Sequence, residues 1–204
     1  MILIGYSGHS YVIHGIFASA GIKVIGYCDK DEKSFNPFSL TYFGVETSEA
    51  ALKAMKENGF FIAIGNNSIR KNIYHQLESF QMFPANAIHS SSIVDASVKL
   101  ASHGIMLAAG AIINPLANIG IGVICNTGCI IEHECKIENF AHIAPGAVLC
   151  GNVHVGENSF IGAGSVVREG IHIGKNCIIG AGSVIVKNIP DNSIVYGNPA
   201  RKNP

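Results

Sequence analysis

The sequence has no tryptophan and little charge. Only 14% of its 204 residues are charged, and 14 basic side chains balance 14 acidic ones. A chain without net charge has no long-range field that would attract nucleic acid or an anionic membrane. No apolar run approaches the ~20 residues that a membrane-spanning helix needs. We therefore expect no nucleic-acid partner and no membrane insertion, and we expect binding to depend on local sites.

The cysteines lack any pattern. The sequence has six, with no CxxC pair and no spacing typical of a small disulfide-rich domain, which argues against a zinc ribbon and a disulfide framework. The opening MILIGYSGHS has no basic segment before its short apolar run, so it favours a strand over a signal peptide. These features predict reduced thiols, no metal and a cytoplasmic protein.

The first part of the chain alternates short apolar runs with segments of helical pattern. The apolar runs are ILIGY, KVIGYC and FFIAIG, and the helical segments lie near residues 10–20, 47–58 and 68–80. Strands that alternate with helices form parallel sheets from βαβ units. The pattern predicts a Rossmann-like α/β domain over residues 1–86.

The second part, residues 87–204, repeats every six residues. Counting in sixes from Leu107 to Ile185 gives fourteen positions, of which thirteen are Ile, Leu or Val. The residue four places after each of these positions is small in most hexads. A helix would repeat near 3.6 and a simple strand at 2. The repeat predicts a left-handed parallel β-helix with three hexads per coil, so that residues 18 apart stack. Glycine directly follows the aliphatic position in several hexads, which we interpret as tight turns.

Several segments together resemble one family. They are the hexads themselves, the run NTGCIIEHECKIENFAHIAPGAVLCGNV, the opening GYSGHS, the segment FFIAIGNNSIRKNIY and the ending YGNPAR. Over nearly its whole length the chain resembles the bacterial hexapeptide-repeat sugar acetyltransferases, above all the UDP-4-amino-sugar N-acetyltransferases of the bacillosamine pathway, with sialic acid O-acetyltransferases as relatives. The resemblance implies acetyl-CoA as co-substrate, a nucleotide-activated amino sugar as acceptor, and a homotrimer with active sites between neighbouring β-helices.

The repeat register presents a candidate base. Ile131 and Cys135 take inward positions, so His133 and Glu134 between them lie outside. A histidine is suited to remove a proton from an attacking amine near neutral pH, and a carboxylate can hold its other ring nitrogen. The resemblance implies these two roles for His133 and Glu134. Gly151 stacks one coil beyond His133, and its N–H is predicted to bind the thioester oxygen and the developing oxyanion.

Other outward positions suggest substrate contacts. Asn126 and His142 match family residues near the acceptor sugar. A column of small residues, which includes Ala163 and Ala181, leaves a shallow channel for the pantetheine arm of acetyl-CoA. The inward position of Cys135 favours core packing over a covalent acyl-enzyme, so direct attack by the acceptor is preferred.

The first strand of the α/β domain ends at a turn that favours phosphate. Ser7, Gly8 and His9 open the following helix, and backbone N–H groups at such a turn attract anions. The pattern is not GxGxxG, which favours a nucleotide sugar over a dinucleotide. A purely structural module is the alternative.

Two further strand ends meet the same edge. Asp29 ends the second strand, where an acid accepts a ribose hydroxyl or, in the resembling family, contacts the nucleotide. Gly65 and Asn66 end the third strand. The family often has a second acid after the first, where this chain has Lys30.

Three other functions are alternatives to this one. O-acetylation of sialic acid or a related sugar is the nearest alternative to N-acetylation. A γ-type carbonic anhydrase shares the β-helix but needs three histidines around zinc, and the histidine spacing here does not fit. A non-catalytic sugar-nucleotide-binding protein is disfavoured by the presence of His133, Glu134 and Gly151 together.

Overall fold

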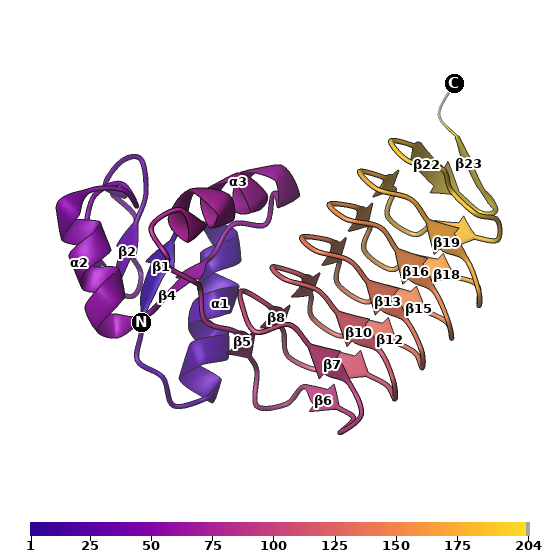
Figure 1. The fold of residues 1–204 in the computed structure, drawn as a ribbon, viewed down its shortest axis with the longest axis horizontal. Coiled ribbons are helices and arrows are strands. Elements are labelled where there is room, and N and C mark those ends of the chain that lie inside the picture. Colours follow the sequence, from indigo (N-terminus) through magenta and orange to yellow (C-terminus); the bar gives the residue numbers. More distant parts are fainter. Residues whose placement is uncertain (203–204) are drawn as a thin grey trace.

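The N-terminal α/β part folds as the alternating pattern predicts. The computed structural model describes residues 1–202, and residues 203–204 of the expected second domain lie outside the described part. Four parallel strands form one sheet in the order β3-β2-β1-β4. The elements of this part, shown at the indigo to magenta end in Figure 1, are β1 (Ile2–Ile4), α1 (Gly8–Ser19), β2 (Gly26–Cys28), β3 (Thr41–Tyr42), α2 (Glu49–Asn58), β4 (Phe60–Ile62) and α3 (Asn67–Glu78).

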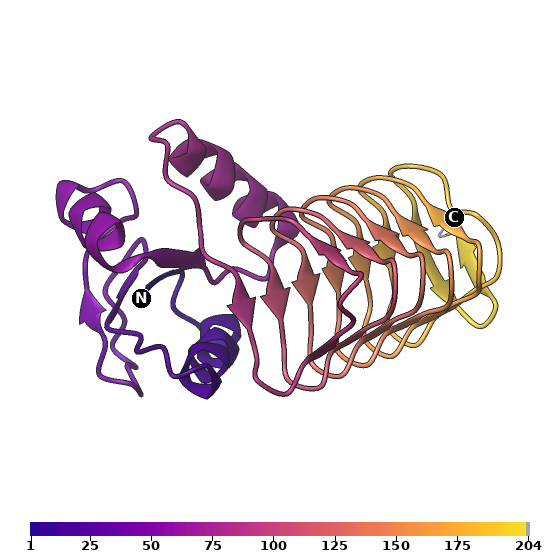
Figure 2. The ribbon, with the colours of Figure 1, turned by 60° about the horizontal axis from the view of Figure 1, so that its bottom comes forward.

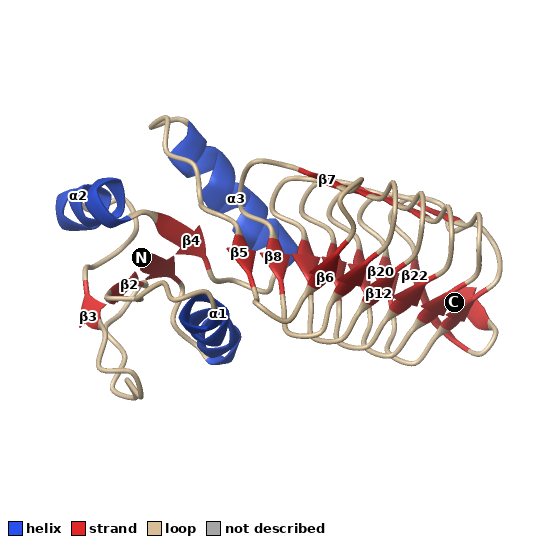
Figure 3. Cartoon of the chain, turned by 90° about the horizontal axis from the view of Figure 1, so that it is seen from below, coloured by secondary structure: helices blue, strands red, loops and turns tan. Residues whose placement is uncertain are grey.

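Helices cover both faces of this sheet. Leu3 and Phe61 pack with the apolar side of α1, while Ile2 and Ile62, one residue away on the same strands, pack with α2 and α3. Successive side chains on a strand point to opposite faces, which explains why these strands are apolar throughout. Figure 3 shows α1 on one side of the sheet and α2 on the other. The short edge strand β3 was not predicted, because two residues carry no periodic signal.

The rest of the chain winds into a parallel β-helix with three faces (Figures 1 and 2). Between residues 106 and 185, paired strands on successive coils are 18 residues apart, as Ile124 opposite His142 illustrates; the offset is 19 residues at the start of the β-helix and 16 at its end. The predicted fold class, a Rossmann-like α/β domain followed by a left-handed parallel β-helix, is confirmed.

Each face has a different outer surface, and we name the faces accordingly. The domain face, on which the α/β part packs, consists of β5 (Ala87–Ile88), β8 (Met106–Leu107), β11 (Ile124–Cys125), β14 (His142–Ile143), β17 (Phe160–Ile161), β20 (Ile178–Ile179), β22 (Ile194–Gly197) and the antiparallel β23 (Ala200–Lys202). The apolar face consists of β6 (Ile93–Val94), β9 (Ile112–Ile113), β12 (Ile130–Ile131), β15 (Val148–Leu149), β18 (Val166–Val167) and β21 (Val184–Ile185).

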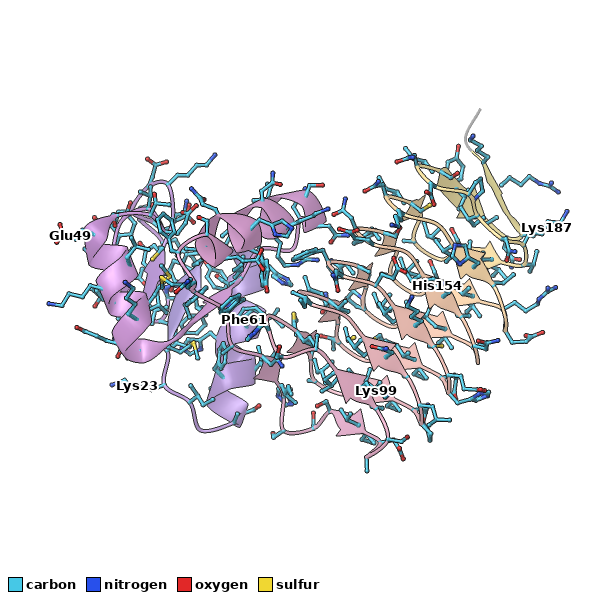
Figure 4. The ribbon with its side chains drawn as sticks, viewed as in Figure 1. Lys23, Glu49, Phe61, Lys99, His154 and Lys187 are labelled. Atoms are coloured by element: carbon cyan, nitrogen blue, oxygen red, sulfur yellow. The ribbon has the colours of Figure 1, made fainter. Side chains whose placement is uncertain are left out.

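The polar face consists of β7 (Lys99–Leu100), β10 (Asn118–Ile119), β13 (Lys136–Ile137), β16 (His154–Val155) and β19 (His172–Ile173). Lys99 and His154, labelled in Figure 4, lie on this face, whereas the labelled Phe61 lies inside the α/β part. His154 and His172, which are 18 residues apart, stack on this face with their Nδ1 atoms 3.0 Å apart.

The interior of the β-helix follows the hexad register. All fourteen positions from Leu107 to Ile185 are at most 1% exposed. The small positions between them are buried as well, and the serines among them satisfy their hydroxyl groups, as when Ser159 Oγ donates to Gly174 O at 2.7 Å. Burial of one aliphatic side chain per hexad is the main stabilising contribution of the solenoid.

The glycines that follow the aliphatic positions were interpreted from the sequence as tight turns, but the structure requires glycine there for another reason. Gly162 does not adopt a left-handed conformation; a Cβ there would lie 2.5 Å from Ala181 N on the next coil. Close approach between coils therefore requires the glycine. Left-handed φ angles occur instead at the corners, at every sixth residue from Gly104 to Gly182.

Candidate active site

His133 and Glu134 stand at the corner that follows β12, between the apolar and the polar face. Their side chains are each 58% exposed, and His133 Nδ1 lies 3.1 Å from Glu134 Oε2. The carboxylate therefore accepts from Nδ1–H and leaves Nε2 as the acceptor nitrogen of a neutral ring. The predicted outward position of both side chains is confirmed.

The backbone of Glu134 is unusual for its residue type. Of the fourteen corner residues with φ in the left-handed region, eight are glycine, three are asparagine, and the others are Leu116, Glu134 and Phe140. Phe140 is 2% exposed and packs against Tyr74 of α3, which accounts for its presence. Glu134, with φ of 61°, has no such packing. Leu116 has the same conformation and is 63% exposed, so the left-handed backbone of Glu134 agrees with a functional site but does not by itself identify one.

Gly151 lies directly against the imidazole of His133. A Cβ at residue 151 would lie 2.5 Å from His133 Nε2 and closer still to Cε1, so only glycine leaves the ring in place. Among residues 1–202, the Gly151 N–H has no hydrogen-bond acceptor. A backbone donor next to a base is the arrangement that acyl transfer needs.

Cys135 is part of the core. It is 1% exposed, its Sγ donates to Cys150 O at 3.2 Å, and burial raises the pKa of the thiol to about 11. A thiol that is neutral and enclosed is a poor nucleophile, in agreement with the packing interpretation.

His142 points outward from the β-helix, yet it is buried. The α/β part covers it, and only 7% of the residue is exposed. Its Nδ1 lies 3.3 Å from Gly65 O, and its Nε2 lies 3.1 Å from Asn126 Nδ2. Burial, assisted by the charge of Arg70 and by His9, lowers its pKa to about 3. The neutral ring is therefore a hydrogen-bonding group and not a proton carrier near pH 7.

His9 joins this cluster from the start of α1. Its ring lies against Gly65, where a Cβ would be 3.5 Å from His9 Cγ, and its centroid is 6.2 Å from that of His142. Burial and then Arg70 lower its pKa to about 4, and its Nε2 is buried without a partner among the described residues. The structure thus brings together four predicted substrate residues, which are His9, Gly65, Asn126 and His142.

The other predicted substrate residues have local roles. The Ser7 N–H donates to Ser10 Oγ at 2.8 Å at the start of α1, and Asn66 Oδ1 caps α3 by accepting from Ile69 N at 3.0 Å. Gly8 faces open space, with no atom within 4 Å of a Cβ position.

Asp29 is engaged within its own domain. Its Oδ2 accepts from Tyr6 N at 2.9 Å, and its Oδ1 forms an ion pair with Lys33 Nζ at 3.1 Å. These contacts hold the ends of β1 and β2 together at the edge where the nucleotide is expected.

A groove of about 520 Å³ runs beside this cluster, between the first turn of α3 and the domain face. Its lining includes Phe160 and Ile178, which stack one and two coils beyond His142, and the rings of His142 and Phe160 are 5.0 Å apart. The register at 18-residue spacing contained the signal for both residues, which the sequence reasoning missed. The full lining is Gly65, Asn66, Asn67, Ser68, Asn158, Phe160, Asn176 and Ile178.

Ala163 and Ala181 are exposed at the corner between the domain face and the apolar face. At this corner, backbone hydrogen bonds join one coil to the next; for example, the N–H of the corner residue Gly182 donates to Ala163 O at 2.8 Å. Gly151 lies at the opposite corner of the apolar face. A single chain therefore does not bring the predicted acetyl-CoA residues together.

Within residues 1–202, no group of three or more His, Cys, Asp or Glu side chains is placed to hold a metal ion. The same part of the chain contains no helix that is both long and apolar enough to cross a membrane.

Comparisons with known proteins match both parts of the chain. Residues 1–77 match the PglD N-terminal domain, and residues 152–187 match the bacterial transferase hexapeptide (six repeats). A curated relative, the GDP-perosamine N-acetyltransferase of Escherichia coli, is 31% identical over 127 residues, which are 59% of this chain. The match spans about half of that relative, 54% of its length.

Two solved structures are similar over nearly the whole chain. A His-to-Asn variant of perosamine N-acetyltransferase from Caulobacter crescentus, in complex with CoA and GDP-perosamine, is 32% identical with a TM-score of 0.92 and covers 100% of this chain and 96% of that one. The acetyltransferase domain of PglB from Neisseria gonorrhoeae, in complex with acetyl coenzyme A, is 31% identical with a TM-score of 0.90 and covers 99% and 98% respectively.

Proposed function

The chain belongs to the hexapeptide-repeat sugar acetyltransferases, and from that premise we propose that it transfers the acetyl group of acetyl-CoA to the amine of a nucleotide-linked amino sugar. One observation supports the reaction type above the others: the His133–Glu134 pair lies beneath the unpaired N–H of Gly151. Residues 87–204 carry the transfer in this proposal, and residues 1–86 hold the nucleotide.

The proposed mechanism is direct attack. The acceptor nitrogen bonds to the thioester carbonyl carbon while His133 Nε2 removes a proton from that nitrogen. Glu134 holds Nδ1–H and stabilises the imidazolium, and the Gly151 N–H donates to the oxyanion. The tetrahedral intermediate then breaks its carbon–sulfur bond, and the departing CoA thiolate takes the proton from His133. A base of this kind contributes about 10²–10⁴-fold.

We propose a homotrimer because the apolar face is uncovered and its two edges carry complementary parts of the site. Its outward residues are aliphatic and β-branched on six successive coils, and Ile93 is 63% exposed. They are Ile93, Ile112, Ile130, Val148, Val166 and Val184.

A cyclic assembly would complete the site. In a closed ring the interface is heterologous, so one edge of each copy meets the other edge of the next. The His133 corner of one copy then approaches the Ala163 corner of its neighbour, and with it the cluster around Asn126 and His142. Acetyl-CoA and the acceptor would bind between copies.

For the nucleotide we place GDP first and UDP second. The resemblance in the sequence favours UDP, whereas the E. coli relative and the C. crescentus complex are named for GDP-perosamine. A cytoplasmic location is part of the proposal, because all six cysteines are free, which is typical of a reducing compartment.

The test is acetyl transfer with a panel of acceptors. The protein is incubated with acetyl-CoA and one acceptor at a time, and free thiol is followed. The acceptors are GDP-, UDP- and dTDP-linked amino sugars, their hydroxyl analogues, and sialic acid. We expect thiol release with an amino sugar and none with its hydroxyl analogue; release with sialic acid instead would select O-acetylation. His133→Ala should lower turnover by about 10²-fold or more, whereas His172→Ala, an exposed histidine on the polar face, should not.

A further inference from the structure

Arg70 is buried at the junction of the two parts of the chain. It lies on α3 and is 1% exposed. Its Nε donates to Gly122 O at 2.9 Å, and its Nη2 donates to Phe140 O at 2.8 Å. Both carbonyls belong to corners of the β-helix. None of its described partners is a carboxylate, so its charge is compensated by carbonyl dipoles alone.

The remaining donors of Arg70 bind the loop before α3. Nη1 donates to Ile64 O at 3.1 Å and to Gly65 O at 3.2 Å, and Nη2 donates to Asn67 Oδ1 at 3.0 Å. A guanidinium has five N–H donors in a fixed plane, and these five bonds use all of them. Burial lowers the pKa of Arg70 to about 9, so the group is protonated near pH 7.

The Gly65 carbonyl determines the tautomer of His142. A carbonyl can only accept, so the 3.3 Å contact requires a proton on His142 Nδ1. The neutral ring then has a lone pair on Nε2. Asn126 must direct its NH₂ group to that lone pair, at 3.1 Å.

A second contact requires the same orientation of Asn126. Its Oδ1 accepts from the backbone N–H of Thr127 at 2.8 Å, which places Nδ2 toward His142. The amide of Asn126 is therefore held at both ends. One N–H of Nδ2 remains for a ligand, and Asn126 is half-exposed at the edge of the cluster.

We propose that Arg70 is a positioning residue of the acceptor site. Through the Gly65 carbonyl and its own charge, Arg70 keeps the ring of His142 neutral and protonated on Nδ1. His142 in turn orients the Asn126 amide so that it donates to the acceptor substrate. The proposal rests on the proposed function for its last step only. An imidazolium would direct an N–H from Nε2 at the NH₂ group of Asn126, and the contact would break. The low pKa of His142, to which burial and Arg70 contribute, agrees with this role.

The first test needs no substrate. Ring ¹⁵N chemical shifts of His142 in the wild-type protein should report the neutral Nδ1–H tautomer throughout pH 5–8. Arg70→Met should mix the tautomers or bring the ring into titration in that range, while Arg70→Lys should do so to a smaller extent. The matched control is Lys71→Met, because the Lys71–Glu157 ion pair of 2.6 Å also joins the two parts of the chain but does not touch His142. An Nε2–H tautomer in the wild type, or an unchanged ring in folded Arg70→Met, would overturn the proposal.

The second test is kinetic. Arg70→Lys should raise KM for the acceptor by about tenfold, the scale of one lost hydrogen bond, and leave KM for acetyl-CoA unchanged. In an Asn126→Ala background the same substitution should add little, since residues that act through one another are not additive. An equal rise in the acceptor KM in both backgrounds would refute the proposal that Arg70 acts through Asn126. Absence of any acetyl transfer by the wild type would instead count against the proposed function, and the ¹⁵N result would still decide the role of Arg70.

Discussion

The contact between Gly151 and His133 permits a sharp test with one methyl group. In Gly151→Ala the new Cβ would lie 2.5 Å from His133 Nε2, which is well inside van der Waals contact, so the imidazole has to move. The ring is free to do so, because the His133 side chain is 58% exposed. The substitution therefore displaces the proposed base and leaves the core untouched.

The expected magnitudes separate activity from stability. Gly151 has no left-handed φ, so alanine can adopt its backbone, and the less flexible unfolded chain favours alanine by about 0.4–1 kcal/mol. We expect the free energy of unfolding to change by less than about 1 kcal/mol in either direction. Displacement of a catalytic group by about 1 Å costs on the order of 10²-fold in rate, and we expect kcat to fall by at least that factor.

Thiol release measures the rate, and urea unfolding measures the stability. Gly15→Ala is the matched control, because Gly15 is exposed on α1 with no atom near a Cβ position, and its kcat should not change. Combined with His133→Ala, the Gly151 substitution should cause little further loss. Wild-type kcat in Gly151→Ala would refute the placement of His133 as the base against this amide.

Three further predictions concern other parts of the chain. Cys135→Ala should keep the wild-type kcat in the thiol-release assay, because its enclosed thiol takes no part in direct attack. Val166→Lys, on the apolar face, should shift the mass measured by light scattering toward the 21.6 kDa of one chain. Acid should destabilise the fold below about pH 6.5. The reason is that His9 and His142 become protonated in the unfolded chain, whereas the folded chain holds their pKa values near 4 and 3. The free energy of unfolding measured in urea should therefore fall by about 1.4 kcal/mol per pH unit for each histidine.

Each of these has a control or a contrary outcome. Loss of transfer in a folded Cys135→Ala protein would point to a covalent acyl-enzyme. Lys99→Glu, on the polar face, should leave the assembled mass unchanged, and an assembled Val166→Lys protein would contradict the proposed interface. His142→Gln should reduce the slope of the acid dependence by about half, because His9 still contributes, and an unchanged slope would mean that other groups cause it.

The β-helix was predictable in detail because its pattern is local. A hexad buries one aliphatic residue whatever lies further along the chain, so the inward position of Cys135 and the outward position of His133 followed from counting. The same counting placed Gly151 above His133. The same 18-residue spacing puts Phe160 and Ile178 in the column of His142, but neither was predicted as a site residue, because the groove they line forms only with α3 in place.

The α/β part was predicted at the level of its elements. Its helices and three of its strands followed from apolar runs between helical segments, whereas β3 was too short to predict. The role of Asp29 was harder to foresee, because its ion pair with Lys33 and its bond to Tyr6 N depend on how two strand ends meet. Arg70 gave no signal, since a charged residue in a polar segment is expected at the surface.

The sequence alone was sufficient to predict three features: the coil, its register, and the outward corner with His133 and Glu134. It could do so because each hexad contacts only the coils directly before and after it. The tertiary structure alone decided that His142 is buried, that Arg70 joins the two parts of the chain, and that Asn126 is oriented through His142. The physical reason is separation along the chain. The bond from Arg70 to Gly122 spans 52 residues and the bond from His142 to Gly65 spans 77, and no short pattern encodes which surface of one domain will cover the face of another.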